Sequence, residues 1–152
     1  MMAKIELSTI INATIETVFN LSRNIDIHLL STHQTNEKAI AGRTSGLIEL
    51  NETVTWRGKH FGIYQNHKSL ISEMVFPTYF VDEMTEGSFK SFRHEHSFEF
   101  ENGNTVMKDT IFYETPFGIF GRFFDALILK NYMASFIKKR NEIIKELAEN
   151  PK

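Results

Sequence analysis

Residues 88–115 read SFKSFRHEHSFEFENGNTVMKDTIFYET and hold two runs of alternating side chains around Asn102-Gly103. Asn-Gly between two such runs is a strong signal for a tight β-hairpin. Because successive side chains of a strand point to opposite faces, the alternate set that carries most of the charged side chains of each run faces water, and the other set faces inward. The inward positions of the two runs are Phe92, His94, His96, Phe98 and Phe100, and then Met107, Asp109, Ile111 and Tyr113.

The same alternation extends upstream of this hairpin. It predicts further antiparallel strands at Ala3–Ile11, Leu47–Trp56, His60–Val75 and Tyr79–Met84, beside Ser88–Phe100 and Thr105–Thr115. Between the first two strands, Asn12 is the expected N-cap of a short helix, with Glu16 in its first turn. The polar stretch His28–Glu37 has room for a second short helix.

The chain beyond Pro116 and Gly118 has helical spacing. Its apolar stripe recurs at steps of three and four residues: Phe120, Phe124, Leu127, Ile128, Tyr132, Phe136, Arg140, Ile143 and Leu147. This stripe needs a partner, and the sheet is the only large one available. We therefore predict one α+β domain over residues 1–152, with a curved antiparallel sheet of six or seven strands wrapped around a long C-terminal helix, two short helices after the first strand, and a cavity between sheet and helix.

Composition narrows the functional classes. The 152 residues carry a net charge of −2, which gives no reason to expect a nucleic-acid partner. The absence of cysteine excludes disulfides and thiol catalysis and is compatible with a cytoplasmic location. No signal peptide and no apolar run of about 20 residues is present, so no membrane span is expected. Fourteen phenylalanines suit either a thick core or the wall of an apolar cavity.

Strand alternation also places ionisable side chains on the inner face of the sheet. The expected cluster is Glu52, Asp82, His94, His96 and Asp109. Buried ionisable groups must be paired, hydrogen-bonded or in contact with a wet cavity. Three interpretations remain open: structural His–Asp pairs, the polar end of an apolar ligand pocket, or a metal site.

The metal interpretation has little support in the sequence pattern. His94-Glu95-His96 puts two imidazoles on one strand face, as in some barrel metalloproteins, but the spacing around it departs from the cupin motif and no second histidine motif follows. We predict no metal and no cofactor. A Gly-x-Ser-x-Gly elbow, a phosphate-binding glycine loop and an HExxH motif are also missing from the sequence.

Several segments resemble the START-like SRPBCC superfamily, the helix-grip proteins that include the birch-pollen allergen. The resemblance spans nearly the whole chain. It is closest at Pro77–Met84, Gly87–Phe89 and His94–Phe98, and continues through Met107–Asp109 and Tyr113–Gly118. The segments are similar to a bacterial subgroup described as ligand-binding or cell-division-inhibitor-like. The resemblance implies a deep apolar cavity for lipids, polyketides or other hydrophobic metabolites, and it implies no particular reaction.

These observations favour a protein that binds a hydrophobic small molecule over an enzyme. The predicted ligand-binding residues are Glu52, Trp56, Phe80, Asp82, Phe92, His94, His96, Phe98, Met107, Asp109, Ile111, Phe124, Ile128 and Tyr132. The first alternative is an enzyme of the cyclase or dehydratase kind, with His94, His96 and Asp109 as acid–base groups. The second is a protein-interaction module that uses the exposed helix or the polar segment 31–38. The sequence leaves the oligomeric state open.

Overall fold

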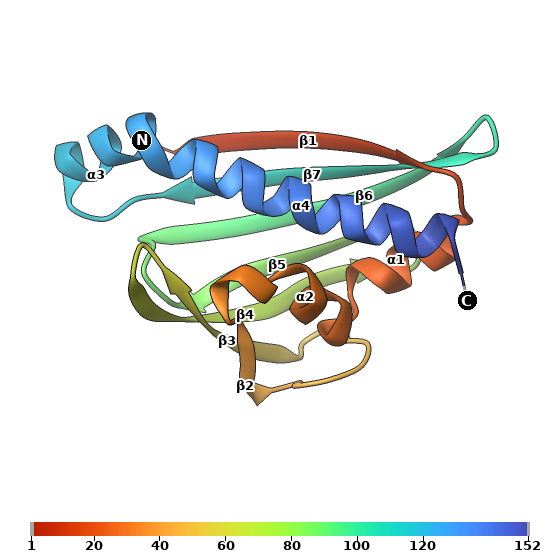
Figure 1. Ribbon diagram of the computed structural model, residues 1–152, viewed down its shortest axis with the longest axis horizontal. Coiled ribbons are helices and arrows are strands. Elements are labelled where there is room, and N and C mark those ends of the chain that lie inside the picture. Colours follow the sequence, from red (N-terminus) through yellow and green to blue (C-terminus); the bar gives the residue numbers. More distant parts are fainter. Residues whose placement is uncertain (1, 152) are drawn as a thin grey trace.

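A computed structural model describes residues 2–151 and shows one seven-stranded antiparallel sheet (Figure 1). Its strand order is β1-β7-β6-β5-β4-β3-β2, so every neighbouring pair except β1 and β7 is also consecutive in the chain. The strands are β1 (Ala3–Ile11), β2 (Lys38–Gly42), β3 (Thr53–His60), β4 (Ile63–Val75), β5 (Tyr79–Glu86), β6 (Ser91–Glu101) and β7 (Asn104–Glu114). The predicted meander and the hairpin at Asn102-Gly103 are confirmed.

Two short helices follow β1 and a long helical segment ends the chain. The helical elements are α1 (Ile15–Ser22), α2 (Ile25–Ser31), the 3₁₀ turn η1 (His33–Thr35), α3 (Gly118–Phe124), the π-helical turn η2 (Asp125–Leu129) and α4 (Lys130–Glu149). α4 runs the length of the sheet, with α1 and α2 beside it on the same side (Figure 1). Met133 and Ile137 of α4 pack on Ile5, Ile111 and Tyr113 of the sheet. The expected sheet closed over a C-terminal helix is therefore confirmed.

Three local expectations are wrong. The N-cap of α1 is Thr14, whose hydroxyl accepts a hydrogen bond from the Thr17 N–H, whereas the Asn12 N–H donates to Glu149 in α4. The predicted strand Leu47–Trp56 begins only at Thr53, because the preceding residues form turns, with Asn51 at a φ of 69°. The edge strand β2 was not predicted; it is five residues long and mostly exposed, so it carries no alternation.

The π-helical turn η2 changes which residues of the last helix are buried. A π turn inserts extra chain into the helix and rotates the residues that precede it relative to those that follow. As a result Phe120, Leu127 and Ile128 are exposed, although the simple helical spacing placed them on the buried stripe. The residues packed inward are Leu129, Met133, Ile137, Arg140, Asn141, Ile144 and Ala148. In the part of the chain that the structure describes, no helix is both long and apolar enough to cross a lipid bilayer.

Candidate functional site

A cavity of about 1090 Å³ lies between the inner face of the sheet and α4. Its walls are mainly apolar and include Ile71, Phe80, Phe92, Leu129, Met133 and Phe136. It reaches the surface where Phe61 meets the start of the last helical segment, and there Phe117 and Phe120 are more than three-quarters exposed. Small-molecule sites usually measure about 300–1,000 Å³ and combine greasy walls with a few polar groups. The lining of this cavity fits that pattern, and its volume lies just above the upper end of the range.

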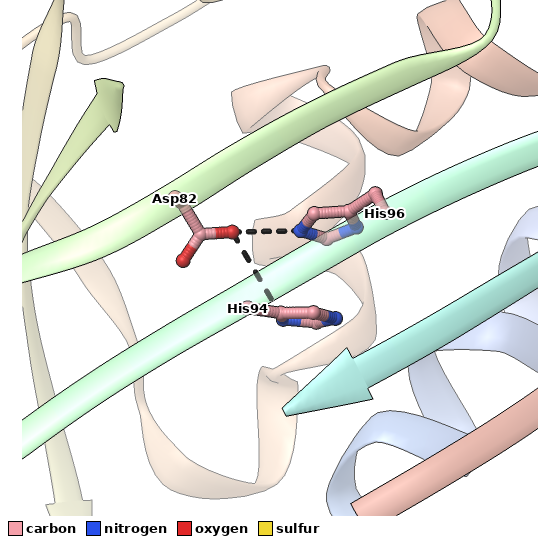
Figure 2. Close-up of side chains that lie close together, drawn as sticks. All are labelled: Asp82, His94 and His96. Carbon is pink, nitrogen blue, oxygen red and sulfur yellow. Dashed lines mark hydrogen bonds and ion pairs between the residues drawn. The ribbon is translucent and has the colours of Figure 1, made fainter. Parts of the chain in front are cut away.

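One polar group on the wall consists of Asp82, His94 and His96 (Figure 2). His94 and His96 lie two residues apart on β6 and share its inner face, and Asp82 lies directly opposite His94 on β5. The two imidazole rings stack with centroids 3.7 Å apart, and Phe80 stacks on the other face of His96 at 4.0 Å. His96 Nε2 is 2.7 Å from Asp82 Oδ2, and His94 Nδ1 is 3.9 Å from the same oxygen.

The surroundings of this group shift its pKa values. Burial would raise the pKa of Asp82, but the hydrogen bond from His96 and the adjacent His94 outweigh it and lower the pKa to about 2. Burial, reinforced by the adjacent His94, lowers the pKa of His96 to about 4. Asp82 is therefore a carboxylate and His96 a neutral imidazole near pH 7.

Behind the two histidines lies a second, fully buried carboxylate. Asp109 Oδ1 is 2.7 Å from His94 Nε2 and 3.5 Å from His96 Nδ1. Its other oxygen accepts a hydrogen bond of 2.7 Å from the Asn141 side chain, and Arg140 Nη1 lies 3.5 Å from Oδ1. Burial raises the pKa of Asp109, but the hydrogen bond from His94 and the charge of Arg140 hold it well below its usual range. Asp109 orients the histidines and does not reach the cavity.

A second polar group of the cavity wall surrounds Glu37, just after η1. Both carboxylate oxygens of Glu37 face histidines, with His28 Nε2 and His60 Nε2 each 3.6 Å away. His60 is also 2.7 Å from the Tyr132 hydroxyl of α4. Burial raises the pKa of Glu37, but the two histidines lower it to about 2. A β-carbon at Gly58 would lie only 2.2 Å from Glu37 Oε2, so β3 needs a glycine here for the carboxylate to pack against it.

The structure sorts the predicted site residues into three sets. Those that line the cavity are Trp56, Phe80, Asp82, Phe92, His94, His96, Phe124 and Tyr132. Those buried behind its wall are Phe98, Met107, Asp109 and Ile111. Those that lie elsewhere are Glu52 and Ile128.

The misplaced residues have identifiable physical causes. Strand alternation gives the face of a side chain, but α1 covers one end of that face, where Phe19 packs edge-on against Phe98 and Ser22 contacts Met107. Glu52 precedes β3 and pairs with Arg43 at 3.0 Å, outside the cavity, so its expected inward position is wrong. Ile128 was misplaced because the π turn rotates it outward.

The sequence analysis missed the group around Glu37 entirely. Its members come from α2, the loop before β2, and the end of β3, so no local spacing connects them. It also gave Asp82 no role as a third ligand beside His94 and His96. The ligand atoms of these three residues all lie within 4.8 Å of one another, a separation that would allow them to hold a metal ion.

Comparison with known proteins identifies the fold as the helix-grip fold of START-like proteins. A START superfamily protein from Mycobacterium smegmatis superposes with a TM-score of 0.71 at 9% identity, covering 96% of this chain and 97% of that one. The major latex-like protein 151 of Panax ginseng gives 0.72 at 14% identity, covering 98% and 99% of the two chains. The protein TTHA0849 from Thermus thermophilus gives 0.69 at 17% identity, covering 93% and 97%. No family model and no curated protein matches the sequence.

Proposed function

We propose that this protein binds a hydrophobic small molecule, such as a lipid, a polyketide or an aromatic metabolite, in the cavity between the sheet and α4. The observation that carries the proposal is the cavity of about 1090 Å³ inside a chain of 152 residues. Well-packed interiors contain few voids larger than a water molecule, so a largely apolar space of this size, open to the surface, favours a ligand-binding function. The likeness to START-like folds agrees with this proposal.

The two polar groups of the wall define what the occupant must carry. The Asp82 group lies on β5 and β6, whereas Glu37 lies in the loop before β2, so an elongated molecule can meet an acceptor or donor at each. Polar groups placed in an apolar cavity fix the orientation of a ligand and select against purely aliphatic ones. We therefore expect a mainly apolar molecule with hydroxyl, carbonyl or amide groups, in preference to a plain hydrocarbon.

Binding is tested by thermal unfolding with a C16 fatty acid and a hydroxylated anthraquinone, together with native mass spectrometry of the protein as purified from cells. Occupancy at 100 times the Kd stabilises the folded state by about 2.7 kcal/mol. For a chain of this size that corresponds to a rise in Tm of roughly 5–11 °C. No shift with any member of a lipid and aromatic panel, and no co-purified molecule, would contradict the proposal.

Adjacent residues of β4 supply a matched pair of variants. Ser69 faces the cavity and Lys68 points to the opposite face of the sheet. Ser69→Trp fills part of the cavity and should weaken binding at least tenfold, whereas Lys68→Trp puts the same side chain outside and should leave binding unchanged. Equal effects of the two variants would place the ligand outside the cavity.

A cyclase- or dehydratase-type enzyme is the second candidate, because His94, paired with Asp109 behind it, and the neutral His96 border the cavity. In this version His94 and His96 are the acid–base groups and Asp109 is a positioning residue, since it lies behind His94. His96→Ala should then spare ligand binding and abolish turnover of any substrate found. Parallel loss of binding and turnover would favour the pure binder.

A further inference from the structure

We propose that Asp82, His94 and His96 form a binding site for one divalent first-row transition-metal ion, such as Zn²⁺, Co²⁺ or Fe²⁺, on the wall of the cavity. Two imidazoles and one carboxylate are a ligand set that such ions favour over Mg²⁺ or Ca²⁺, which prefer oxygen ligands. Figure 2 shows the carboxylate of Asp82 directed toward the two stacked rings across the gap between β5 and β6.

The distances already approach those that an ion would impose. An ion bonded at about 2.0–2.2 Å to each ligand holds the ligand atoms about 3.0–3.5 Å apart. The separations from Asp82 Oδ2 are 2.7 Å to His96 Nε2 and 3.9 Å to His94 Nδ1, one shorter and one longer than that range. A displacement of under about 1 Å of one oxygen evens out these two separations. Among residues 2–151 these two histidines are the only hydrogen-bond or ion-pair partners of Asp82, and His67 interacts with it through charge alone, so no other direct contact opposes this movement. The ligand atoms of the two histidines lie within 4.8 Å of each other on stacked rings, so a rotation of at least one ring completes the site.

The positions of the imidazole protons supply an independent argument. A neutral imidazole carries one N–H and one lone pair. When His94 donates its Nε2–H to Asp109 and carries no second proton, its Nδ1 has a free lone pair, 3.9 Å from Asp82 Oδ2. His94 is thus already in the tautomer that a metal at this position requires.

His96 cannot satisfy both of its nitrogens in the metal-free site. If its proton is on Nε2, it donates to Asp82 and leaves Nδ1 buried without a hydrogen-bond partner. If its proton is on Nδ1, it faces Asp109 at 3.5 Å, but the lone pair of Nε2 then faces the Asp82 carboxylate. A cation between Nε2 and Asp82 removes the repulsion between these two lone pairs, because the ion accepts both of them while Nδ1–H faces the Asp109 carboxylate at 3.5 Å.

The groups behind the ligands also match a metal site. Ligating histidines usually donate their second N–H to a carboxylate, which fixes the ring and raises its basicity. Asp109 is within reach of both histidines, and Asn141 and Arg140 of α4 hold it in turn. On the opposite side all three ligands border the cavity, so a bound ion keeps open coordination positions toward whatever molecule occupies it. Such an ion can bind a carbonyl, phenolate or hydroxamate oxygen of the ligand.

The test begins with protein freed of metal by a chelator and of hydrophobic ligand by organic extraction. Zn²⁺ is titrated by calorimetry and Co²⁺ by visible absorption, since Co²⁺ in a four- or five-coordinate nitrogen and oxygen site gives characteristic d–d bands. We expect one ion per chain with a Kd below about 10 µM. In ¹H–¹⁵N spectra of the imidazoles, Zn²⁺ should shift the His94 and His96 signals first, a measurement that needs no variant.

Matched variants locate the ion. Asp82→Asn keeps the shape of the side chain and should weaken Zn²⁺ binding at least tenfold, and His94→Gln should act similarly. Glu83→Gln is the control, because Glu83 is the next residue of β5 and pairs with Arg93 instead of the histidines, and it should change the Kd less than twofold. Glu37→Gln shows whether the ion binds at the Glu37 group instead. The inference is overturned if no ion binds with a Kd below about 100 µM, or if Asp82→Asn binds Zn²⁺ with the same Kd as the wild-type protein. It is also overturned if Glu37→Gln, and not Asp82→Asn, abolishes the binding. Ligand binding by the proposed function is measured separately, so either idea can fail alone.

Discussion

Replacement of Asp109 by asparagine should be among the most destabilising conservative changes in this protein. The carboxylate is 1% exposed, and its oxygens contact His94 and Asn141 at 2.7 Å each and Arg140 at 3.5 Å. Asp109→Asn has almost the same volume, so packing is preserved. The loss of charge leaves the guanidinium of Arg140 buried without an anion, and the new amide also presents N–H groups to donors.

The cost can be worked out from this geometry. Removal of one partner of a buried ion pair costs about 3–5 kcal/mol. For a chain of about 150 residues each kcal/mol lowers Tm by roughly 2–4 °C, so Asp109→Asn should lower Tm by roughly 6–20 °C. Calorimetry and urea unfolding at pH 7 measure the loss. Lys108→Gln, on the exposed face of the same strand, should change the stability by less than about 0.5 kcal/mol.

A charge swap makes the test specific to the ion pair. In the double variant Asp109→Asn/Asn141→Asp the carboxylate moves to a position whose side chain already accepts a hydrogen bond of 2.9 Å from Arg140. This variant should regain at least half of the lost stability. A fall in Tm of less than about 2 °C for Asp109→Asn, or no recovery in the double variant, would refute the interpretation of Asp109 as the anchor of the site.

Three further outcomes follow from local features. The pKa of Glu37 is about 2 in the folded protein against an ordinary 4.5. Its ionised form therefore stabilises the fold by roughly 3 kcal/mol above pH 5, and this stabilisation is lost as the pH falls toward 2. Glu37→Gln should flatten this part of the curve of unfolding free energy against pH, and an unchanged curve would contradict the assignment. Thr14→Ala removes the cap of α1 and should cost about 1 kcal/mol in urea unfolding; a larger loss for Asn12→Ala would restore Asn12 as the cap. Gly121→Ala places a β-carbon 1.9 Å from the Pro116 carbonyl oxygen and should cost about 1–3 kcal/mol, and unchanged thermal unfolding would show that α3 shifts freely.

The sequence determined the architecture because both of its hydrophobic periodicities are strong: the two-residue alternation of the strands and the three- to four-residue spacing of the last helix. The alternation around Asn102-Gly103 fixed the hairpin of β6 and β7, and it also placed His94, His96 and Asp109 on one inner face. A strand has only two faces, so once the charged side chains show which face is exposed to water, the remaining side chains are assigned to the inner face. The helical spacing after Gly118 required a long helix, and the sheet was its only partner.

The tertiary structure alone decided which inward residues border the cavity and which are buried behind it. Phe98 and Phe92 share one face of β6, yet α1 covers the first and leaves the second on the cavity wall. The contact of Asp82 with His94 depends on the register of β5 against β6, and the Glu37 group gathers elements far apart in the chain. Local periodicity reports the direction of a side chain, whereas distances between residues of different elements are set by how the elements pack. The inner cluster expected from the strands was therefore right in its two histidines and its two aspartates and wrong in Glu52. Which of these side chains contact one another was decided only by the fold.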